Sequence, residues 1–296
     1  MVKMIDYKTD FNGTDIPWVE SPFFYDLLET KPLSEEEYNL AKHYHEEGYV
    51  ILDLNLSEKF IKETILEVDN KVRSNSFKSQ ESGYHYSKHP RLFEAWKWSN
   101  HVLELTKNKK VLDTLKFLYK RNPLPFQTIN FVGGAQQPLH SDTIHFSSIP
   151  QRWLGVSWIA LEDVDEENGT LMYVPKSHKL PIFEFSNIGI EVPKYGEQFD
   201  AYSKYESFIK QMVESKGLEI KTFTAKKGQA LIWSANLLHG SVPIADENRT
   251  RYSQATHYYF DGCSKYYSPM FSDTLRGNVS EKDLTEKDII NHEIKL

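Results

Sequence analysis

The sequence is poor in cysteine and has no surplus of positive charge. Cys263 is the single cysteine among 296 residues, which excludes an internal disulfide and any zinc or iron–sulfur site that needs several thiolates. The 35 Lys and Arg residues are outnumbered by 42 Asp and Glu residues, and the net charge is −7. Because a phosphate backbone is bound mainly by clustered Lys and Arg, we expect no nucleic-acid partner.

Long apolar runs are missing as well. No stretch approaches the roughly 18 consecutive apolar residues of a membrane-spanning helix, so we expect no association with a membrane. The first residues, MVKMIDYK, turn polar at once, whereas a secretory leader continues into an apolar core. Together with the single thiol, this start predicts a reducing, cytoplasmic location.

The remaining composition is that of a globular protein rich in aromatic residues. Hydrophobic residues make up 40% and aromatic residues 14% of the chain, enough for a sheet-rich core or an aromatic-lined pocket. We predict one domain over residues 1–296. Its predicted parts are an N-terminal arm with helices (1–121), a β-rich core (122–262) with an insertion (180–218), and a C-terminal tail (263–296).

Helical patterns precede the β-rich core. Ser34 followed by three glutamates is typical of a helix start, and Gly48 of its end. Further helices are predicted at 57–72 and at about 100–120. The insertion contains a helical apolar stripe, which would form either a lid over a site or a patch on the outside of the core.

Short β-rich runs separated by turn residues follow from Asn122 onward. They predict strands at 126–132, 153–162, 170–175, 220–224, 229–234 and 251–260. Many short strands with flanking helices predict a mainly β fold with a sandwich or jelly-roll core.

His140-Ser141-Asp142 is the first candidate for chemistry. In extended backbone, residues i and i+2 project to the same side, so His140 and Asp142 can reach one metal ion. His45-Glu46-Glu47 has the same spacing but lies in a helical pattern, where residues i and i+2 point apart. Spacing and local structure together therefore favour the segment at 140–142.

His239-Gly240-Ser241 can supply a third ligand, because it follows the predicted strand 229–234. In a jelly roll, the end of a late strand can lie beside the end of an early one. His140, Asp142 and His239 would then place two imidazoles and one carboxylate on one face of a metal, which suits non-haem Fe(II) oxygen chemistry. His239 taken alone is better explained as a structural histidine, so the interpretation depends on the complete set.

Arg249 and Arg251 come next and share a strand phase, so both can point inward. A buried arginine is costly unless an anion pairs with it. A planar guanidinium matches a carboxylate with two parallel hydrogen bonds, which makes a carboxylate co-substrate a suitable partner. The alternative is a surface strand that carries two solvated arginines.

Taken in order, these motifs resemble the phytanoyl-CoA dioxygenase family of Fe(II)/2-oxoglutarate oxygenases. The resemblance includes WIALED at 158–163, NGTL at 168–171, and VPKSHK at 174–179 with Lys176 where the family usually has glycine. It covers residues 35–262 and is strongest over 126–180 and 226–260.

The resemblance implies a double-stranded β-helix, the jelly-roll or cupin-like fold, with His140, Asp142 and His239 as iron ligands. It also implies that an arginine after His239 holds the distal carboxylate of 2-oxoglutarate. The residues implied for the co-substrate are Arg251 (with Arg249 as the alternative), Ser241, Trp158 and Gln127. Ordinary core packing is the alternative for Trp158 and Gln127.

The activity implied by the resemblance is a dioxygenase reaction that uses Fe(II), 2-oxoglutarate and O₂. It would hydroxylate a C–H bond of a small organic metabolite and release succinate and CO₂. The presence of Asp142 disfavours halogenation, because related halogenases lack the carboxylate ligand. No dense Lys/Arg cluster accompanies the motifs, which favours a small metabolite over a CoA thioester. His145 is a candidate substrate contact, whereas His178 and His257 are interpreted as structural.

Two other function classes stay open at this point. A cupin-like metal isomerase or hydrolase would use the same three ligands without 2-oxoglutarate, so co-substrate binding separates the two. A non-catalytic jelly-roll binding protein would bind no iron.

Overall fold

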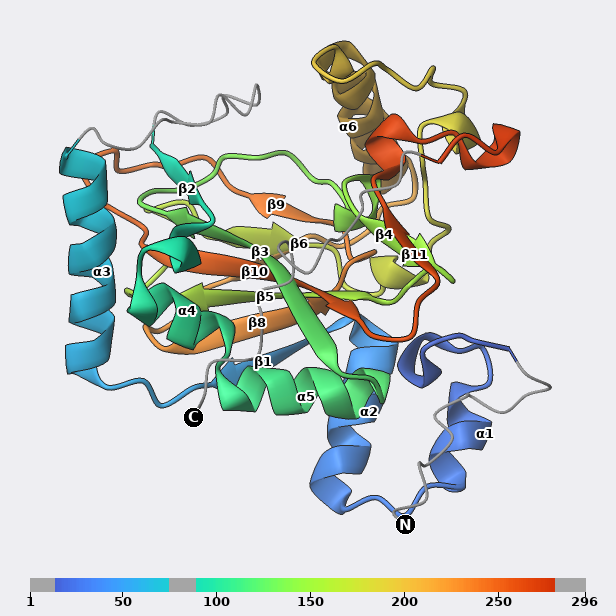
Figure 1. Ribbon diagram of the computed structural model, residues 1–296, viewed down its shortest axis with the longest axis horizontal. Helices are drawn as coiled ribbons and strands as arrows, with labels where there is room; N and C mark the ends of the chain where they lie inside the picture. The colour runs from blue at the N-terminus through green and yellow to red at the C-terminus, as the bar shows by residue number, and fades with distance from the viewer. Residues whose placement is uncertain (1–13, 75–88, 280–296) are drawn as a thin grey trace.

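A computed structural model describes residues 14–74 and 89–279 (Figure 1). Residues 1–13 of the predicted arm and 280–296 of the predicted tail therefore lie outside the described residues. A six-stranded antiparallel sheet, the major sheet, has the strand order β1-β8-β5-β10-β3-β2. Its strands are β1 (Tyr49–Asp53), β8 (Gln229–Ser234), β5 (Leu154–Ala160), β10 (Ser253–Phe260), β3 (Pro123–Phe131) and β2 (Arg91–Phe93).

A three-stranded sheet, the minor sheet, faces the major one and has the order β7-β6-β9. Its strands are β7 (Lys221–Phe223), β6 (Leu171–Tyr173) and β9 (His239–Ser241). β4 (Ser147–Ile149) and β11 (Lys265–Tyr267) pair separately. Trp158 and Leu231 of the major sheet pack with Leu171 and Phe223 of the minor sheet in one buried cluster. Two sheets around one apolar interior confirm the predicted double-stranded β-helix.

Side chains alternate between the two faces of the major sheet. In β8, Leu231 and Trp233 belong to the interior cluster, whereas Ala230 and Ile232 belong to a second cluster that contains the helices. This alternation follows from the two-residue period of a strand. Helices therefore cover the outer face of the major sheet, as the mainly β class with flanking helices predicts.

The helices before the core begin and end largely where the sequence predicts them. Ser34 caps α2 (Glu35–Glu47) in a capping box, and Gly48 ends it with a φ of 86°. The helix predicted at about 100–120 is two helices, because the Asn108 side chain accepts hydrogen bonds from the amides of Lys110 and Val111 and starts a new helix. The α-helices of this part are α1 (Phe24–Glu29), α2, α3 (Glu58–Arg73), α4 (Asn100–Thr106) and α5 (Lys109–Tyr119).

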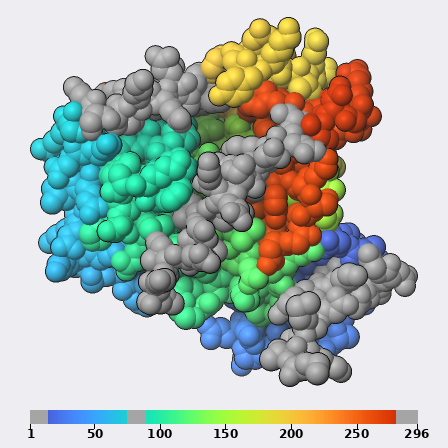
Figure 2. Space-filling model, viewed as in Figure 1, coloured from blue at the N-terminus to red at the C-terminus, as the bar shows by residue number. Residues whose placement is uncertain are grey.

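The insertion carries α6 (Gln198–Ser215), which buries Tyr202, Tyr205 and Ile209 together with Met270 of the C-terminal segment. Figures 1 and 2 show α6 beside this segment, away from α3. Single 3₁₀ turns lie at Trp18–Glu20, Ala95–Lys97, Asp142–Ile144, Ser177–Lys179, Ser186–Ile188, Pro269–Phe271 and Thr274–Arg276. Over 14–74 and 89–279, no helix combines the length and apolar character that crossing a membrane requires.

Candidate functional site

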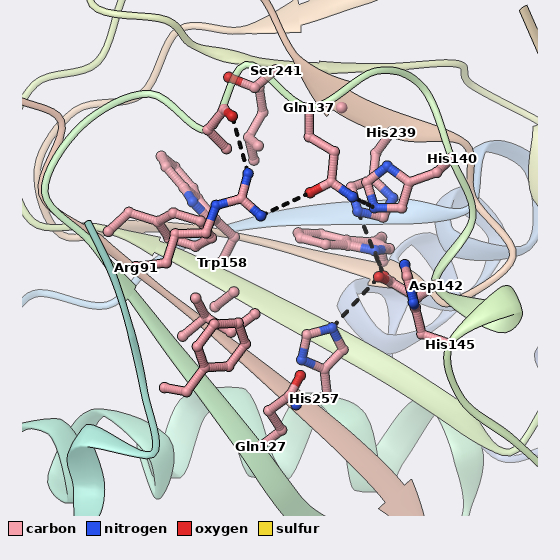
Figure 3. A pocket seen from close by; sticks show the side chains of 18 of the residues that line it. Arg91, Gln127, Gln137, His140, Asp142, His145, Trp158, His239, Ser241 and His257 are labelled. Carbon is pink, nitrogen blue, oxygen red and sulfur yellow. Dashed lines mark hydrogen bonds and ion pairs between the residues drawn. The ribbon is translucent and has the colours of Figure 1, made fainter. Parts of the chain in front are cut away.

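A cavity of about 260 Å³ lies in the interior between the two sheets. Strands of both sheets contribute to its wall, including β3, β10 and β9. Figure 3 shows His140, Asp142 and His239 grouped on one side of it, with Ser241 and Arg91 further along. The two groups define a candidate metal-binding end and an arginine end of one cavity.

The backbone brings His140 and His239 together. The amide of each residue donates to the carbonyl of the other, both at 2.9 Å, and the two form an isolated antiparallel bridge. Directly opposed residues project to the same face, and their imidazole ring centres are 4.4 Å apart. A side chain at Gly240 would place its Cβ 2.6 Å from the carbonyl oxygen of Gln137, so glycine permits this approach.

Asp142 completes the set from the start of a 3₁₀ turn. One ligand atom from each of His140, Asp142 and His239 lies within 4.8 Å of the others, and all three residues are buried. Asp142 Oδ2 accepts a hydrogen bond from Trp233 Nε1 at 2.9 Å, and Asp142 Oδ1 lies 3.5 Å from His257 Nε2. These contacts fix the carboxylate toward the two imidazoles.

The histidines present their Nε2 atoms to this site. Nδ1 of His140 lies 2.9 Å from the carbonyl oxygen of Pro138, and Nδ1 of His239 lies 3.0 Å from that of Leu237. A carbonyl oxygen only accepts, so Nδ1 carries the proton and Nε2 keeps its lone pair.

Burial and neighbouring charge set the protonation of these groups. Burial lowers the pKa of His140 well below its usual value, which keeps the ring neutral. For Asp142, burial raises the pKa, but nearby His239, His257 and His140 outweigh it, and the pKa lies below its usual range. Two imidazoles and one carboxylate form the donor set that a divalent transition metal prefers.

Arg251 forms the other end of the cavity and is 0% exposed. Its Nη1 donates to the carbonyl oxygen of Gly169 at 2.8 Å, and the Ser241 hydroxyl donates to the same oxygen at 3.0 Å. Nε and Nη2 of Arg251 are buried and have no hydrogen-bond partner among the described residues, nor does Trp158 Nε1. Burial, and then repulsion from Arg91, lowers the pKa of Arg251 to about 9.

Arg249 lies outside the cavity, so the expectation that both arginines point inward is wrong for this residue. Its Nη1 donates to Asp165 at 2.8 Å and to Glu167 at 3.1 Å. β10 begins at Ser253, so Arg249 and Arg251 precede the strand, and the two-residue alternation of a strand does not apply to them.

The other residues singled out in the sequence fall into two groups. Gln127, His145 and His257 line the cavity, and the position of His257 beside Asp142 differs from its interpretation as purely structural. His178 is buried, and its Nε2 lies 2.9 Å from the carbonyl oxygen of His45, as a structural histidine would be. His45 itself lies in α2.

Sequence reasoning missed four residues around the site. Arg91 and Trp233 line the cavity, and so does Gln137, whose Nε2 lies 3.2 Å from His140 Nε2. Tyr202 of α6 reaches the same amide group, and its hydroxyl is also 3.1 Å from His145 Nε2. Gln137 stands three residues before His140, a proximity that was visible in the sequence, whereas Arg91 and Tyr202 arrive from distant segments.

The chain is similar to known proteins in sequence and in structure. The sequence model of the phytanoyl-CoA dioxygenase (PhyH) family matches residues 42–251. The peroxisomal phytanoyl-CoA dioxygenase of Bos taurus is 25% identical over 167 residues, which are 52% of this chain and 45% of the relative. The chain thus matches less than half the length of that relative.

Solved structures share the fold. The non-haem, α-ketoglutarate-dependent epimerase SnoN from nogalamycin biosynthesis has a TM-score of 0.60 at 19% identity, covering 81% of this chain and 88% of its own. EctD from S. alaskensis, with 2-oxoglutarate and 5-hydroxyectoine, has a TM-score of 0.59 at 17% identity, covering 83% and 81%. At identities of 19% and 17%, this similarity shows a shared fold alone.

Proposed function

Since the chain belongs to the phytanoyl-CoA dioxygenase family, we propose that it is an Fe(II)- and 2-oxoglutarate-dependent dioxygenase. The proposed reaction consumes O₂ and 2-oxoglutarate, hydroxylates a C–H bond of a small organic metabolite, and releases succinate and CO₂. One oxygen atom enters the product and the other enters succinate, so the reaction balances without a further reductant.

The observation that carries this proposal is the pairing of two ends in one cavity. One end holds the His140–Asp142–His239 set, and the other holds the buried Arg251, two of whose nitrogens have no hydrogen-bond partner in the part of the chain that the structure describes. An isomerase or hydrolase that uses a metal alone has no need of that arginine. A buried guanidinium without an anion is costly, so Arg251 indicates that a carboxylate enters the cavity with the metal.

The residues that line the cavity fit both Fe(II) and 2-oxoglutarate. His140 and His239 offer Nε2 lone pairs and Asp142 offers a carboxylate, and these three groups would hold Fe(II). Arg251 and the Ser241 hydroxyl would hold the distal carboxylate of 2-oxoglutarate. Trp158 Nε1 and Gln127 also face this space, and we assign them to the co-substrate.

Bound Fe(II) would supply the activation of O₂ that oxidises 2-oxoglutarate and the substrate. The chain positions the reactants and excludes competing ligands. Trp233 and His257 hold the Asp142 carboxylate in place, and backbone carbonyls fix the two imidazoles. Apolar wall residues such as Phe146 and Ile129 limit water around the substrate.

The test is to add Fe(II) and then 2-oxoglutarate to the protein without oxygen and to record the visible spectrum. We expect a weak charge-transfer band that needs both components and is lost in His140→Ala. Iron binding without the band would favour the metal isomerase or hydrolase, and absence of iron binding would favour the binding protein.

A second measurement addresses the outcome of the reaction. With a turned-over substrate, hydroxylation predicts one succinate for each product molecule whose mass has risen by one oxygen atom. A product of unchanged mass, or one lighter by two hydrogen atoms, would refute hydroxylation while leaving the co-substrate assignment intact.

A further inference from the structure

His257 brings a buried, unsatisfied polar atom to the wall of the cavity. The residue lies on β10, lines the cavity and is 5% exposed. Its Nε2 atom lies 3.5 Å from Asp142 Oδ1, whereas its Nδ1 atom is buried and has no hydrogen-bond partner among the described residues. Figure 3 shows the ring between Asp142 and Gln127, on the side of the cavity away from Ser241. One nitrogen of the ring therefore contacts a proposed metal ligand, and the other is left without a partner.

The backbone and two aromatic rings set the orientation of this imidazole. The pairing of β10 with β3 shifts register directly after His257, which itself faces Gln127. Such β-bulges re-aim a side chain and are frequent beside active sites. The ring centres of Phe126 and Phe146 lie 6.1 and 5.3 Å from that of His257. The imidazole is thus held by its surroundings, and its Nδ1 atom does not reach a donor on the neighbouring strand.

The contact with Asp142 fixes which nitrogen carries the ring proton. A carboxylate oxygen only accepts hydrogen bonds, so the proton lies on Nε2 and Nδ1 keeps its lone pair. A buried acceptor without a donor is unfavourable. We therefore expect a molecule that enters the cavity to donate a hydrogen bond to Nδ1 of His257.

Neither of the two groups already proposed for the cavity is such a donor. Fe(II) carries no proton, and 2-oxoglutarate offers two carboxylates and a keto oxygen, all of which only accept. The proposed place of its distal carboxylate is also at Arg251 and Ser241, and Figure 3 shows Ser241 far from His257 within the cavity. The donor is therefore expected in the third reactant, which is the substrate.

We propose that His257 binds the substrate by accepting a hydrogen bond at Nδ1, so that the substrate carries a hydroxyl or an N–H group. This inference rests on the proposed function and adds the substrate class: a small alcohol or amide whose donor group lies one imidazole ring away from the Asp142 carboxylate. Phe93, Ile129 and Phe146 line the same cavity and can enclose the carbon part of such a molecule.

The test uses pairs of isomers that differ in a hydrogen-bond donor. The pairs are benzyl alcohol with anisole, pentan-1-ol with 1-methoxybutane, and N-ethylacetamide with N,N-dimethylacetamide; only the first member of each pair donates. Each compound is titrated by calorimetry, without oxygen, into protein loaded with Fe(II) and 2-oxoglutarate. We expect at least one donor to bind about 2- to 10-fold more tightly than its isomer, the range for one hydrogen bond between uncharged groups.

Two substitutions separate the roles of the two ring nitrogens. Asparagine places its amide near the position of Nδ1, whereas glutamine places its amide near the position of Nε2. His257→Asn should therefore keep the preference for donors but bind Fe(II) about 10- to 100-fold more weakly, because Asp142 loses a supporting contact. His257→Gln should keep the affinity for Fe(II) and lose the preference for donors. A residue that only supports the fold would not show this reciprocal result.

His43→Gln is the matched control, because His43 is an exposed residue of α2 that does not line the cavity. It should leave both affinities unchanged. Equal affinity within every pair, including no binding of any compound, would overturn the proposal, and so would tighter binding of the isomers that lack a donor. A preference for donors that survives in His257→Gln would overturn the assignment to His257.

A separate titration with 2-oxoglutarate in the presence of Fe(II) distinguishes failure of the proposed function. Binding that is kept in His257→Gln shows that this variant is folded and that its co-substrate site is intact. If 2-oxoglutarate does not bind to the native protein, the proposed function fails. A preference for donors that is lost in His257→Gln would still support the contact at His257 in that case.

Discussion

Replacing Gly240 with alanine tests whether the close approach of β9 to the 137–138 segment builds the metal site. The new Cβ would lie 2.6 Å from the carbonyl oxygen of Gln137 and 2.9 Å from that of Pro138. Both are backbone atoms, so no rotation of a side chain relieves the overlap. The backbone pair between His140 and His239 must therefore separate.

The expected magnitude follows from the contacts that are lost. Overpacking at such a position costs about 1–3 kcal/mol, and each of the two hydrogen bonds between His140 and His239 contributes about 1 kcal/mol. Displaced ligands should lower metal affinity about 10- to 100-fold, as loss of supporting contacts does. Calorimetric titration of Fe(II) without oxygen measures the affinity, and urea unfolding measures the stability.

Gly155→Ala is the control for this substitution. Gly155 lies in β5, and its new Cβ would meet Leu115 Cδ2 at 3.1 Å, the flexible end of a side chain. We expect some loss of stability with unchanged metal affinity. If Gly240→Ala binds iron as tightly as the native protein, the close approach of β9 is not what sets the ligand geometry.

Three further predictions follow from the same contacts. Arg251→Gln should weaken the binding of 2-oxoglutarate by about 10- to 100-fold, whereas Arg249→Gln should leave this affinity unchanged. Equal losses of affinity in the two variants, measured by calorimetry, would contradict the assignment of Arg251 to the co-substrate. Tyr205→Phe removes the acceptor for the buried amide of Ser141 and should cost about 1–3 kcal/mol in urea unfolding, with weaker iron binding. Burial lowers the pKa of His178 to about 4, so the unfolded chain takes up its proton first as pH falls. The contribution of His178 to the free energy of unfolding is therefore fully present above the unfolded pKa of about 6.5, and about 3 kcal/mol of it is lost as the pH falls toward 4. An equally steep loss of stability in His178→Gln would contradict this prediction.

Much of the fold follows from local patterns in the sequence. Ser34 and Gly48 mark the ends of α2 because capping and left-handed backbone are local properties. The long strands β5, β8 and β10 show as β-rich runs. β2, β4, β9 and β11 have three residues each and lie outside the β-rich runs of the sequence, so they form because partner strands lie beside them. β6 and β7 are as short, but they lie within the runs predicted at 170–175 and 220–224.

The three candidate metal ligands, which the structure brings together, could be grouped from the sequence, but Arg249 and Arg251 could not be told apart. His140 and Asp142 share a face through i, i+2 spacing, and His239 follows a visible strand. Arg249 and Arg251 are also two residues apart, so the same pattern places both on one face. The structure places them differently because acidic residues more than eighty positions earlier in the chain bind Arg249 alone. Asp165 and Glu167 hold Arg249 outside, which no pattern around residue 250 reveals.

The insertion at 180–218 shows how a distant segment enters the chemistry of the site. Ser141 lies between two of the proposed metal ligands, and its buried amide needs an acceptor. Tyr205 of α6 provides that acceptor at 3.2 Å, and Tyr202 on the same helix contacts Gln137 beside His140. If the insertion only covered the outside of the core, removing it would leave residues 140–142 unchanged. Because α6 supplies these hydroxyls, changes to the insertion should alter iron affinity even where they touch neither the cavity nor a ligand.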